Sequence, residues 1–176
     1  MTDTKAELSN YTSRAGGAAL GARLRRLSER IDREVAQFYT QQGVAFEQRW
    51  YGTLNLLDRF ESLTVGELSG ALGISHVSVS QARDSLHRAG LVETAADPED
   101  ARRKMLRLSK KGRALVDRLR PTWAALSAAA EALDREAGGV VEALDRLERL
   151  LDARSIGDRA KRYRKGDPGA SPGEPR

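Results

Sequence analysis

Residues 64–113 read TVGELSGALG (64–73), ISHVSVSQARDSLHRAG (74–90), LVETA (91–95), ADPEDARR (96–103), KMLRLS (104–109) and KKGR (110–113). This succession predicts a short helix, a tight turn, a longer helix, a strand, a charged loop, a second strand and the basic start of another helix. Two helices joined by so short a turn are typical of a helix-turn-helix, and the strands add a wing. The predicted fold class is therefore mainly α with a small β-wing.

The first helix of this segment has clear boundary signals. Thr64 and Glu67 have the spacing of a capping box, in which each side chain satisfies a free amide at the helix start. Gly73 can adopt the left-handed conformation that ends a helix, and Ser75 is a good N-cap for the next one. The apolar positions of the first helix are Val65, Leu68 and Leu72.

The second helix divides into two faces when residues are placed about 100° apart. The face expected to pack on the core contains Val79, Ala82 and Leu86. The opposite face contains Val77, Ser80, Gln81, Asp84 and Arg88, with Ser78 and Ser85 at its flank. This polar face is either solvated or a surface that enters the major groove of DNA.

For DNA binding, the residue types on the outer face have defined uses. Gln81 can pair bidentately with adenine, Ser78 and Ser80 can bond to bases or phosphates, and Val77 can contact a thymine methyl. Asp84 fits less well, because phosphates repel a carboxylate unless it meets cytosine N4 or a basic neighbour. The candidate DNA-binding residues are Ser75, His76, Val77, Ser78, Ser80, Gln81, Arg83, Arg88, Asp100, Arg102, Arg103 and Lys104.

The predicted wing is strongly basic. Seven of the twelve residues from Arg102 to Arg113 are Lys or Arg, and none is acidic. Such cations neutralise phosphates and release counterions, which supplies most sequence-independent affinity for DNA. An arginine at the tip of a wing could also enter a narrow minor groove. In the second strand, Met105 and Arg107 alternate with Leu106 and Leu108, as expected of a half-buried strand.

These residues resemble the MarR-type (multiple-antibiotic-resistance) transcriptional regulators over about residues 20–133. The most specific parts are ELSGALGISHVSVSQARDSLHRAGLVE, DPEDARR and LRLSKKGRALV, and Asp100 and Arg102 occupy the family's Asp-x-Arg wing signature. Ser109 to Gly112 resembles the start of the helix after the wing. One departure is His76-Val77, where many members carry small polar residues. The resemblance implies a homodimer, a palindromic operator in double-stranded DNA and often a small-molecule effector.

Length and composition agree with this interpretation. A chain of 176 residues holds one domain plus accessory helices, and a net charge of +5 with a pI near 9.8 suits a polyanionic partner. The absence of cysteine excludes disulfides and thiolate metal sites. No apolar run suggests a membrane span and no signal peptide is recognised, so a cytoplasmic location is expected.

Two apolar stripes flank the winged segment. They comprise Leu20, Leu24, Leu27, Ile31, Val35 and Phe38 near the N-terminus, and Val140, Leu144, Leu147 and Leu151 after Gly138-Gly139. A two-layer winged domain cannot cover both, so they predict N- and C-terminal dimerisation helices; the alternative is that the stripes pack on each other. The expected organisation is a flexible N-terminus (1–13), a dimerisation helix and connecting helix (14–60), a winged helix-turn-helix DNA-binding domain (61–113), a long kinked helix and C-terminal dimerisation helix (114–163) and a disordered tail (164–176).

An aromatic cluster lies between the first stripe and the winged segment. Five of the chain's nine aromatic residues fall within residues 38–51. Such a cluster forms either plain core or, with one arginine, a pocket for a small aromatic or carboxylated effector. The candidate effector-binding residues are Phe38, Tyr39, Phe46, Arg49, Trp50 and Tyr51.

Towards the C-terminus, Pro121 predicts a kink or a fresh helix start. Five of the seven residues from Arg159 to Lys165 are basic, and they either contact DNA or only solvate the end of a helix.

No enzyme, cofactor or metal site is predicted, because His76 and His87 are the only histidines and no phosphate loop or nucleophile motif occurs. The alternatives to a sequence-specific regulator are a winged-helix protein-interaction module and a non-specific architectural DNA-binding protein.

Overall fold

The computed structural model describes residues 11–96 and 104–164. The wing residues Asp100, Arg102 and Arg103 lie outside these ranges, as do most residues of the two chain ends that were expected to be disordered. The elements in chain order are α2 (Tyr11–Arg14), η1 (Gly16–Ala19), α3 (Leu20–Gln41), η2 (Gln48–Trp50), α4 (Tyr51–Phe60), β1 (Ser62–Leu63), α5 (Val65–Leu72), α6 (His76–Arg88), β2 (Val92–Ala96), β3 (Lys104–Leu108), α7 (Lys110–Glu136), α8 (Val140–Ala153) and α9 (Ile156–Arg164).

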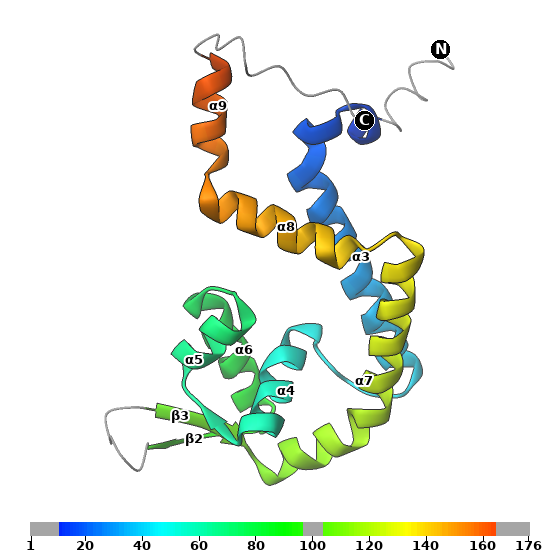
Figure 1. Ribbon diagram of the computed structural model, residues 1–176. Helices are drawn as coiled ribbons and strands as arrows, with labels where there is room; N and C mark the ends of the chain where they lie inside the picture. Colours follow the sequence, from blue (N-terminus) through cyan, green and yellow to red (C-terminus); the bar gives the residue numbers. More distant parts are fainter. Residues whose placement is uncertain (1–10, 97–103, 165–176) are drawn as a thin grey trace. The chain divides into compact units, whose positions relative to one another are not determined.

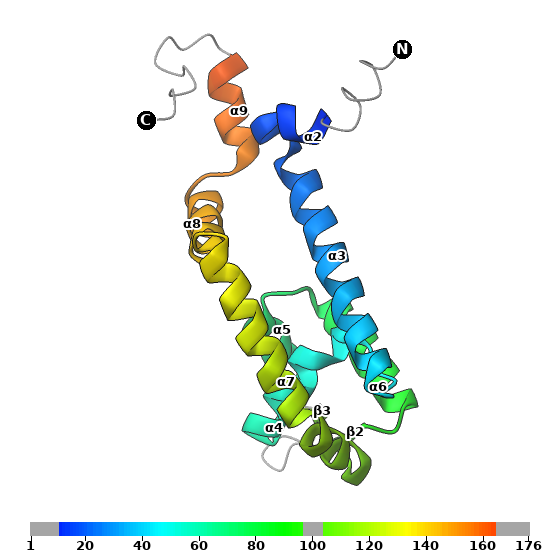
Figure 2. The ribbon, with the colours of Figure 1, turned by 90° about the vertical axis from the view of Figure 1, so that its right-hand side faces the viewer.

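The fold is mostly helical with one small antiparallel sheet, which confirms the predicted fold class (Figure 1). The strand order is β1-β3-β2, and β2 pairs with β3 from Val92↔Leu108 to Ala96↔Lys104. The third strand, β1, was not predicted, because two residues are too few to show a period of two. The long helix α3 runs without a break, as two views at right angles show (Figures 1 and 2).

The predicted boundary signals of α5 and α6 are confirmed. Thr64 Oγ1 accepts a hydrogen bond from the Glu67 amide at 3.2 Å, and Glu67 Oε2 accepts one from the Thr64 amide at 2.7 Å. Gly73 ends α5 in the left-handed conformation, with φ of 63°. Ser75 caps α6 by accepting from the Ser78 amide at 3.1 Å. These bonds fix a short, defined turn ahead of α6.

The core of the winged domain joins α4, α5, α6, β3 and the first turns of α7. Its most buried aliphatic side chains are Leu54, Leu57, Leu68, Val79, Leu86, Leu106, Leu108, Val116 and Leu119. Leu106 and Leu108 are buried while Arg107 is exposed, which confirms the predicted alternation along β3. Burial of this apolar surface holds α6 in place, at roughly 1.5–3 kcal/mol for each large side chain.

The start of α7 is joined tightly to the backbone that follows α6. Ser109 Oγ donates to the Gly90 carbonyl at 2.7 Å and accepts from the Gly112 amide at 2.9 Å. A Cβ atom on Gly112 would lie only 2.0 Å from the Leu91 carbonyl oxygen. The glycine is therefore required by close approach of two backbones, which explains its place in the Ser109–Gly112 segment.

The chain forms two compact units, 1–121 and 122–176, and the division follows Pro121. Pro121 lies inside α7, which is assigned as one helix, so no fresh helix begins there. Since proline has no amide hydrogen, one helical hydrogen bond is missing at this point. In the second unit, Gly138 and Gly139 have φ of 83° and 81° and separate α7 from α8.

The basic stretch at the C-terminus binds the helix end that precedes it. Arg159 donates to the carbonyls of Leu150 at 2.6 Å and Arg154 at 3.1 Å. Hydrogen bonds from Lys161 and Ser155 hold the pKa of Asp158 below its ordinary value. The Arg159 side chain thus satisfies free carbonyl groups at the C-terminal end of α8. Within the described residues, no helix is long and apolar enough to cross a membrane.

We predict that Gly112→Ala destabilises the winged domain by about 1–3 kcal/mol, because the added methyl group meets the Leu91 backbone, which cannot move aside freely. Urea denaturation followed by circular dichroism measures the change. Gly70→Ala is the matched control, since Gly70 lies in α5 with nothing within 4 Å of the position that the added methyl group would take. The control should gain roughly 0.5–1 kcal/mol. Equal stability of the two variants would contradict the close approach.

Candidate nucleic-acid interface

Helix α6 presents one apolar and one polar face, as predicted. Val79, Ala82 and Leu86 are buried in the domain core. The residues that remain exposed on the other side include His76, Val77, Gln81, Asp84 and Arg88, while Ser80 and Arg83 are half-buried. The side chain of Val77 is 66% exposed, which is unusual for an aliphatic residue beside a well-packed core. The outer face is therefore free to contact a partner.

Ser85 corrects one detail of the helical projection. It was placed at the flank of the outer face, but it is only 5% exposed. Its hydroxyl lies against residues 47–50, with hydrogen bonds to Glu47, Arg49 and Trp50. The predicted position of Ser85 around the helix axis was nearly right. Its burial depends on residues 47–50, which the pattern of α6 alone does not reveal.

The N-terminus of α6 is exposed at Ser75, His76, Val77 and Ser78. The Ser75 and Ser78 hydroxyl oxygens are 2.9 Å apart and share one hydrogen bond. Free amides and the positive end of the helix dipole favour anions at such a terminus. This end can therefore accept a phosphate as well as present side chains to base edges.

Asp84 has the basic neighbour that a DNA-facing carboxylate needs. Arg83 Nη2 lies 2.8 Å from Asp84 Oδ1, so the acidic charge is compensated on the helix itself. An open recess of about 460 Å³ adjoins this part of the helix and is lined by Arg49, Gln81, Asp84, His87 and Arg88. Arg49, which the sequence placed with the aromatic cluster, thus lies beside the outer face of α6.

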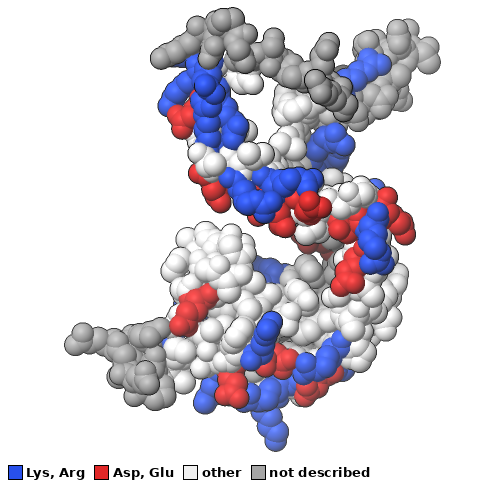
Figure 3. Space-filling model, in the orientation of Figure 1, with Lys and Arg blue, Asp and Glu red and all other residues white. Residues whose placement is uncertain are grey.

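The described part of the wing carries alternating charge. Lys104 is exposed opposite Ala96, and Arg107 pairs across the strands with Glu93 at 3.2 Å. Figure 3 shows Lys and Arg interspersed with Asp and Glu along the lower edge of the view, over the first part of α7. Arg120 there bonds to Asp58 at 2.8 Å, and these hydrogen bonds raise its pKa. The described surface is therefore mixed in charge on this side.

The candidate effector residues separate into different environments. Tyr39 is buried and lies 4.5 Å from Phe46 between ring centroids, and Phe46 meets Trp50 edge-on at 5.8 Å. Phe38 and Tyr51 are half-buried. Tyr39, Phe46 and Trp50 thus form an aromatic cluster with tilted and edge-on contacts that joins α3 to the winged domain.

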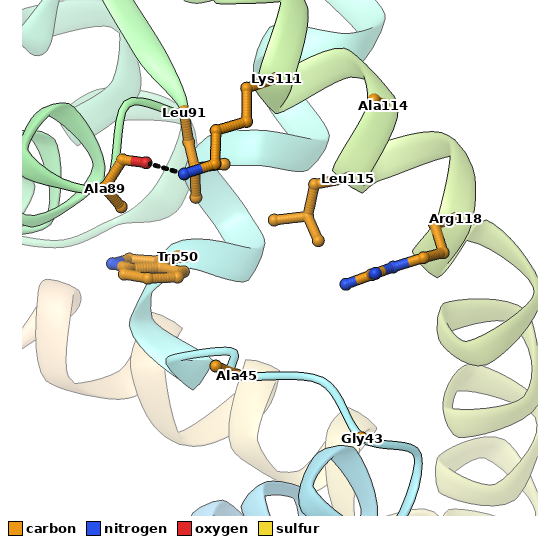
Figure 4. A pocket seen from close by; sticks show the side chains of 9 residues that line it. All are labelled: Gly43, Ala45, Trp50, Ala89, Leu91, Lys111, Ala114, Leu115 and Arg118. Atoms are coloured by element: carbon orange, nitrogen blue, oxygen red, sulfur yellow. Dashed lines mark hydrogen bonds between the residues drawn. The ribbon is translucent and has the colours of Figure 1, made fainter.

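A cavity of about 710 Å³ opens beside this cluster (Figure 4). Of the six candidate effector residues only Trp50 lines it. Its walls are Gly43, Ala45, Trp50, Ala89, Leu91, Lys111, Ala114, Leu115 and Arg118. Figure 4 shows Arg118 extending from α7 towards the centre, while Lys111 Nζ donates to the Ala89 carbonyl at 2.8 Å.

The cationic wall of this cavity was missed by sequence reasoning. Lys111 and Arg118 lie more than 60 residues beyond Trp50, so no local pattern links them. The only available signal was spacing, because 111, 114, 115 and 118 fall on one face of a helix. Over the described residues there is no group of three or more His, Cys, Asp or Glu side chains that could hold a metal ion.

Comparison with known proteins agrees with this geometry. Residues 43–103 match the MarR family. This segment, about a third of the chain, is therefore similar to the MarR family. No curated protein matches the sequence.

Solved structures share the MarR fold at low sequence identity. BpsR of Bordetella bronchiseptica, studied for regulation of its DNA binding by 6-hydroxynicotinic acid, has a TM-score of 0.60 and 22% identity over 73% of this chain and 91% of its own. A mutant MarR of E. coli complexed with operator DNA has a TM-score of 0.60 and 19% identity, over 75% and 93%. The S. aureus MepR–DNA complex has a TM-score of 0.59 and 20% identity, over 73% and 97%.

Proposed function

We propose that this protein is a transcriptional regulator, acting as a repressor, that binds a palindromic operator in double-stranded DNA as a homodimer. The observation that carries the proposal is the outer face of α6, which is polar and exposed on a helix whose other face is fully packed. A rigid helix with a free polar face and an adjoining wing is the element that reads a major groove. The fold shared with the DNA-bound MarR and MepR structures supports it.

The charge distribution near α6 suits duplex DNA. The Asp84 carboxylate is paired with Arg83, so it does not oppose phosphates alone. Arg88, Arg49 and Lys104 are exposed cations around the same face. The wing sequence adds Arg102 and Arg103 as candidate phosphate or minor-groove contacts. Base-edge contacts would then come from Gln81, Ser80, Ser78 and Val77.

We predict that selection from a random duplex pool yields one palindromic operator, and that Gln81→Ala weakens binding to it by roughly 1–3 kcal/mol. The reason is that a base-edge contact contributes only on the correct sequence, so affinity for scrambled duplex should change little. Fluorescence anisotropy across a salt series measures both affinities.

The matched control is Gln41→Ala, which removes an exposed glutamine at the end of α3 and should change neither affinity. Equal weakening of Gln81→Ala on operator and scrambled DNA would show that α6 does not read bases at this position. Selection of no preferred sequence would favour an architectural protein, and binding to no duplex would favour a protein-interaction module.

The homodimer is proposed from the stripe on α3. Its first four members, Leu20 to Ile31, are exposed, and Leu27 and Ile31 are 48% and 51% accessible. On α8, Val140 and Leu151 are exposed and Leu144 and Leu147 are half-buried. Apolar stripes of this length favour burial against a second copy. Twofold pairing also presents two α6 helices to half-sites about one helical turn apart.

We predict a particle of twice the 19.3 kDa chain mass by light scattering, and a shift towards monomer for the double variant Leu27→Glu with Ile31→Glu. Two buried carboxylates at an apolar interface are strongly unfavourable. Arg33→Glu is the control, because it changes the charge of α3 by the same two units away from the stripe. A wild-type monomer, or equal dissociation of variant and control, would contradict the dimer.

We further propose that the cavity between Trp50 and α7 binds a small aromatic carboxylate that releases the operator. Its volume lies in the usual range of ligand pockets, and its walls are mainly apolar. Among the described residues Arg118 has no ion-pair partner, so its exposed guanidinium is free to bind a carboxylate bidentately. The effect of 6-hydroxynicotinic acid on BpsR supports this ligand class.

We predict that calorimetric titration with 6-hydroxynicotinate, benzoate and related aromatic carboxylates identifies a ligand, and that Arg118→Gln weakens it by about 10- to 100-fold, the usual value of a charge-assisted hydrogen bond. Arg113→Gln, on the same helix but outside the cavity, should bind as the wild type does. Binding by no member of the panel, or equal binding by the two variants, would contradict this assignment.

A further inference from the structure

A single buried hydroxyl joins α6 to the segment that precedes α4. Ser85 Oγ donates to Glu47 Oε1 at 3.0 Å and accepts from Trp50 Nε1 at 3.1 Å and Arg49 Nη2 at 3.2 Å. A serine hydroxyl has one donor and two acceptor positions, and all three are used. Because Ser85 is almost fully buried, loss of any of these bonds leaves a polar group without a compensating partner.

The segment that holds Ser85 is itself braced. Arg49 Nε donates to Glu47 Oε2 at 2.6 Å, so the carboxylate, the guanidinium and the serine hydroxyl form a closed network. Trp50 is 8% exposed and packs edge-on against Phe46. Residues 47–50 therefore act as a fixed anchor for α6.

The position of Ser85 along α6 determines what this anchor controls. Ser85 lies four residues after Gln81 and three before Arg88, so it is about one helical turn from each of them. The hydrogen bonds of Ser85 fix the rotation of α6 about its axis, and that rotation sets where Gln81 and Arg88 point. The apolar contacts of Val79, Ala82 and Leu86 hold the helix in the core, but they are less directional than hydrogen bonds.

The same indole that binds Ser85 forms a wall of the 710 Å³ cavity. Figure 4 shows the indole nitrogen on the side away from Leu115 and Arg118, so the ring lies between the cavity and α6. An indole is a rigid plane, and a displacement of its cavity face also moves its N–H group. One hydrogen bond therefore links this wall of the cavity to Ser85 in the helix proposed to read DNA.

We propose that Ser85 is a positioning residue for the outer face of α6, and that Trp50 couples this position to the cavity. The inference rests on the proposed DNA-binding function and specifies how that function is regulated. Because the same hydrogen bond joins the two sites, we expect operator binding at α6 to change the environment of Trp50 even without a ligand in the cavity.

The test uses Trp50 fluorescence without any ligand. The chain has two tryptophans, so in a Trp123→Phe background Trp50 is the only emitter. We expect saturating operator duplex to shift the Trp50 emission, and Ser85→Ala to abolish that shift while lowering operator affinity about tenfold. Anisotropy of a labelled duplex measures operator affinity separately. Absence of DNA binding would contradict the proposed function, whereas normal binding without an emission shift would contradict only the coupling.

Ser69→Ala is the matched control. Ser69 is also buried, and its hydroxyl donates to the Ile74 carbonyl at 2.6 Å in the turn before α6, away from Trp50. This variant should retain the emission shift. An emission unchanged by operator in the reference protein, or a full shift in Ser85→Ala, would overturn the coupling.

A second measurement does not depend on fluorescence. Trp50→Phe removes the indole N–H and keeps an aromatic ring, so it should lower operator affinity by a factor similar to Ser85→Ala. If the two residues act through one bond, the double variant should lose little more than either single variant. Fully additive losses would overturn the inference.

Discussion

The whole arrangement depends on the burial of one face of α6. Val79, Ala82 and Leu86 enter a core supplied by α4, α5, β3 and the start of α7, and His76, Val77, Gln81, Asp84 and Arg88 on the opposite face remain exposed. The turn before α6 is fixed by Ser75 and Gly73, and the turn after it by the contact of Gly112 with Leu91. Backbone geometry thus fixes the position of each end of α6, and the hydrogen bonds of Ser85 fix the rotation of α6 about its axis. A polar surface held this rigidly loses little conformational entropy when it binds.

The electrostatics follow from the same geometry. Exposed ion pairs such as Arg83–Asp84 and Arg107–Glu93 contribute little to stability, but they remove isolated acidic charge from the surface proposed to face phosphates. The remaining cations are then free to act on a polyanion. The apolar stripes on α3 and α8 are exposed in the single chain, and the proposed homodimer would remove them from water.

Local signals in the sequence predicted most of the winged domain. The Thr64–Glu67 capping box, Gly73, Ser75 and the alternation in β3 are short-range features, and each is confirmed. What could not be predicted depends on contacts between distant residues. The partners of Ser85 lie some 35 residues earlier, and the cationic wall of the cavity comes from α7. Strand β1 exists only because β3 pairs with it.

The most direct way to test whether α6 reads DNA is to locate this helix on the duplex. Because the chain has no cysteine, Val77→Cys supplies a single attachment point for an iron–EDTA cleavage reagent on the outer face of α6. We predict two clusters of strand cleavage on the selected operator, one in each half-site, with the pattern of a reagent in the major groove. Cleavage spread evenly along the duplex, as free iron–EDTA produces, would contradict the claim that this helix reads the operator.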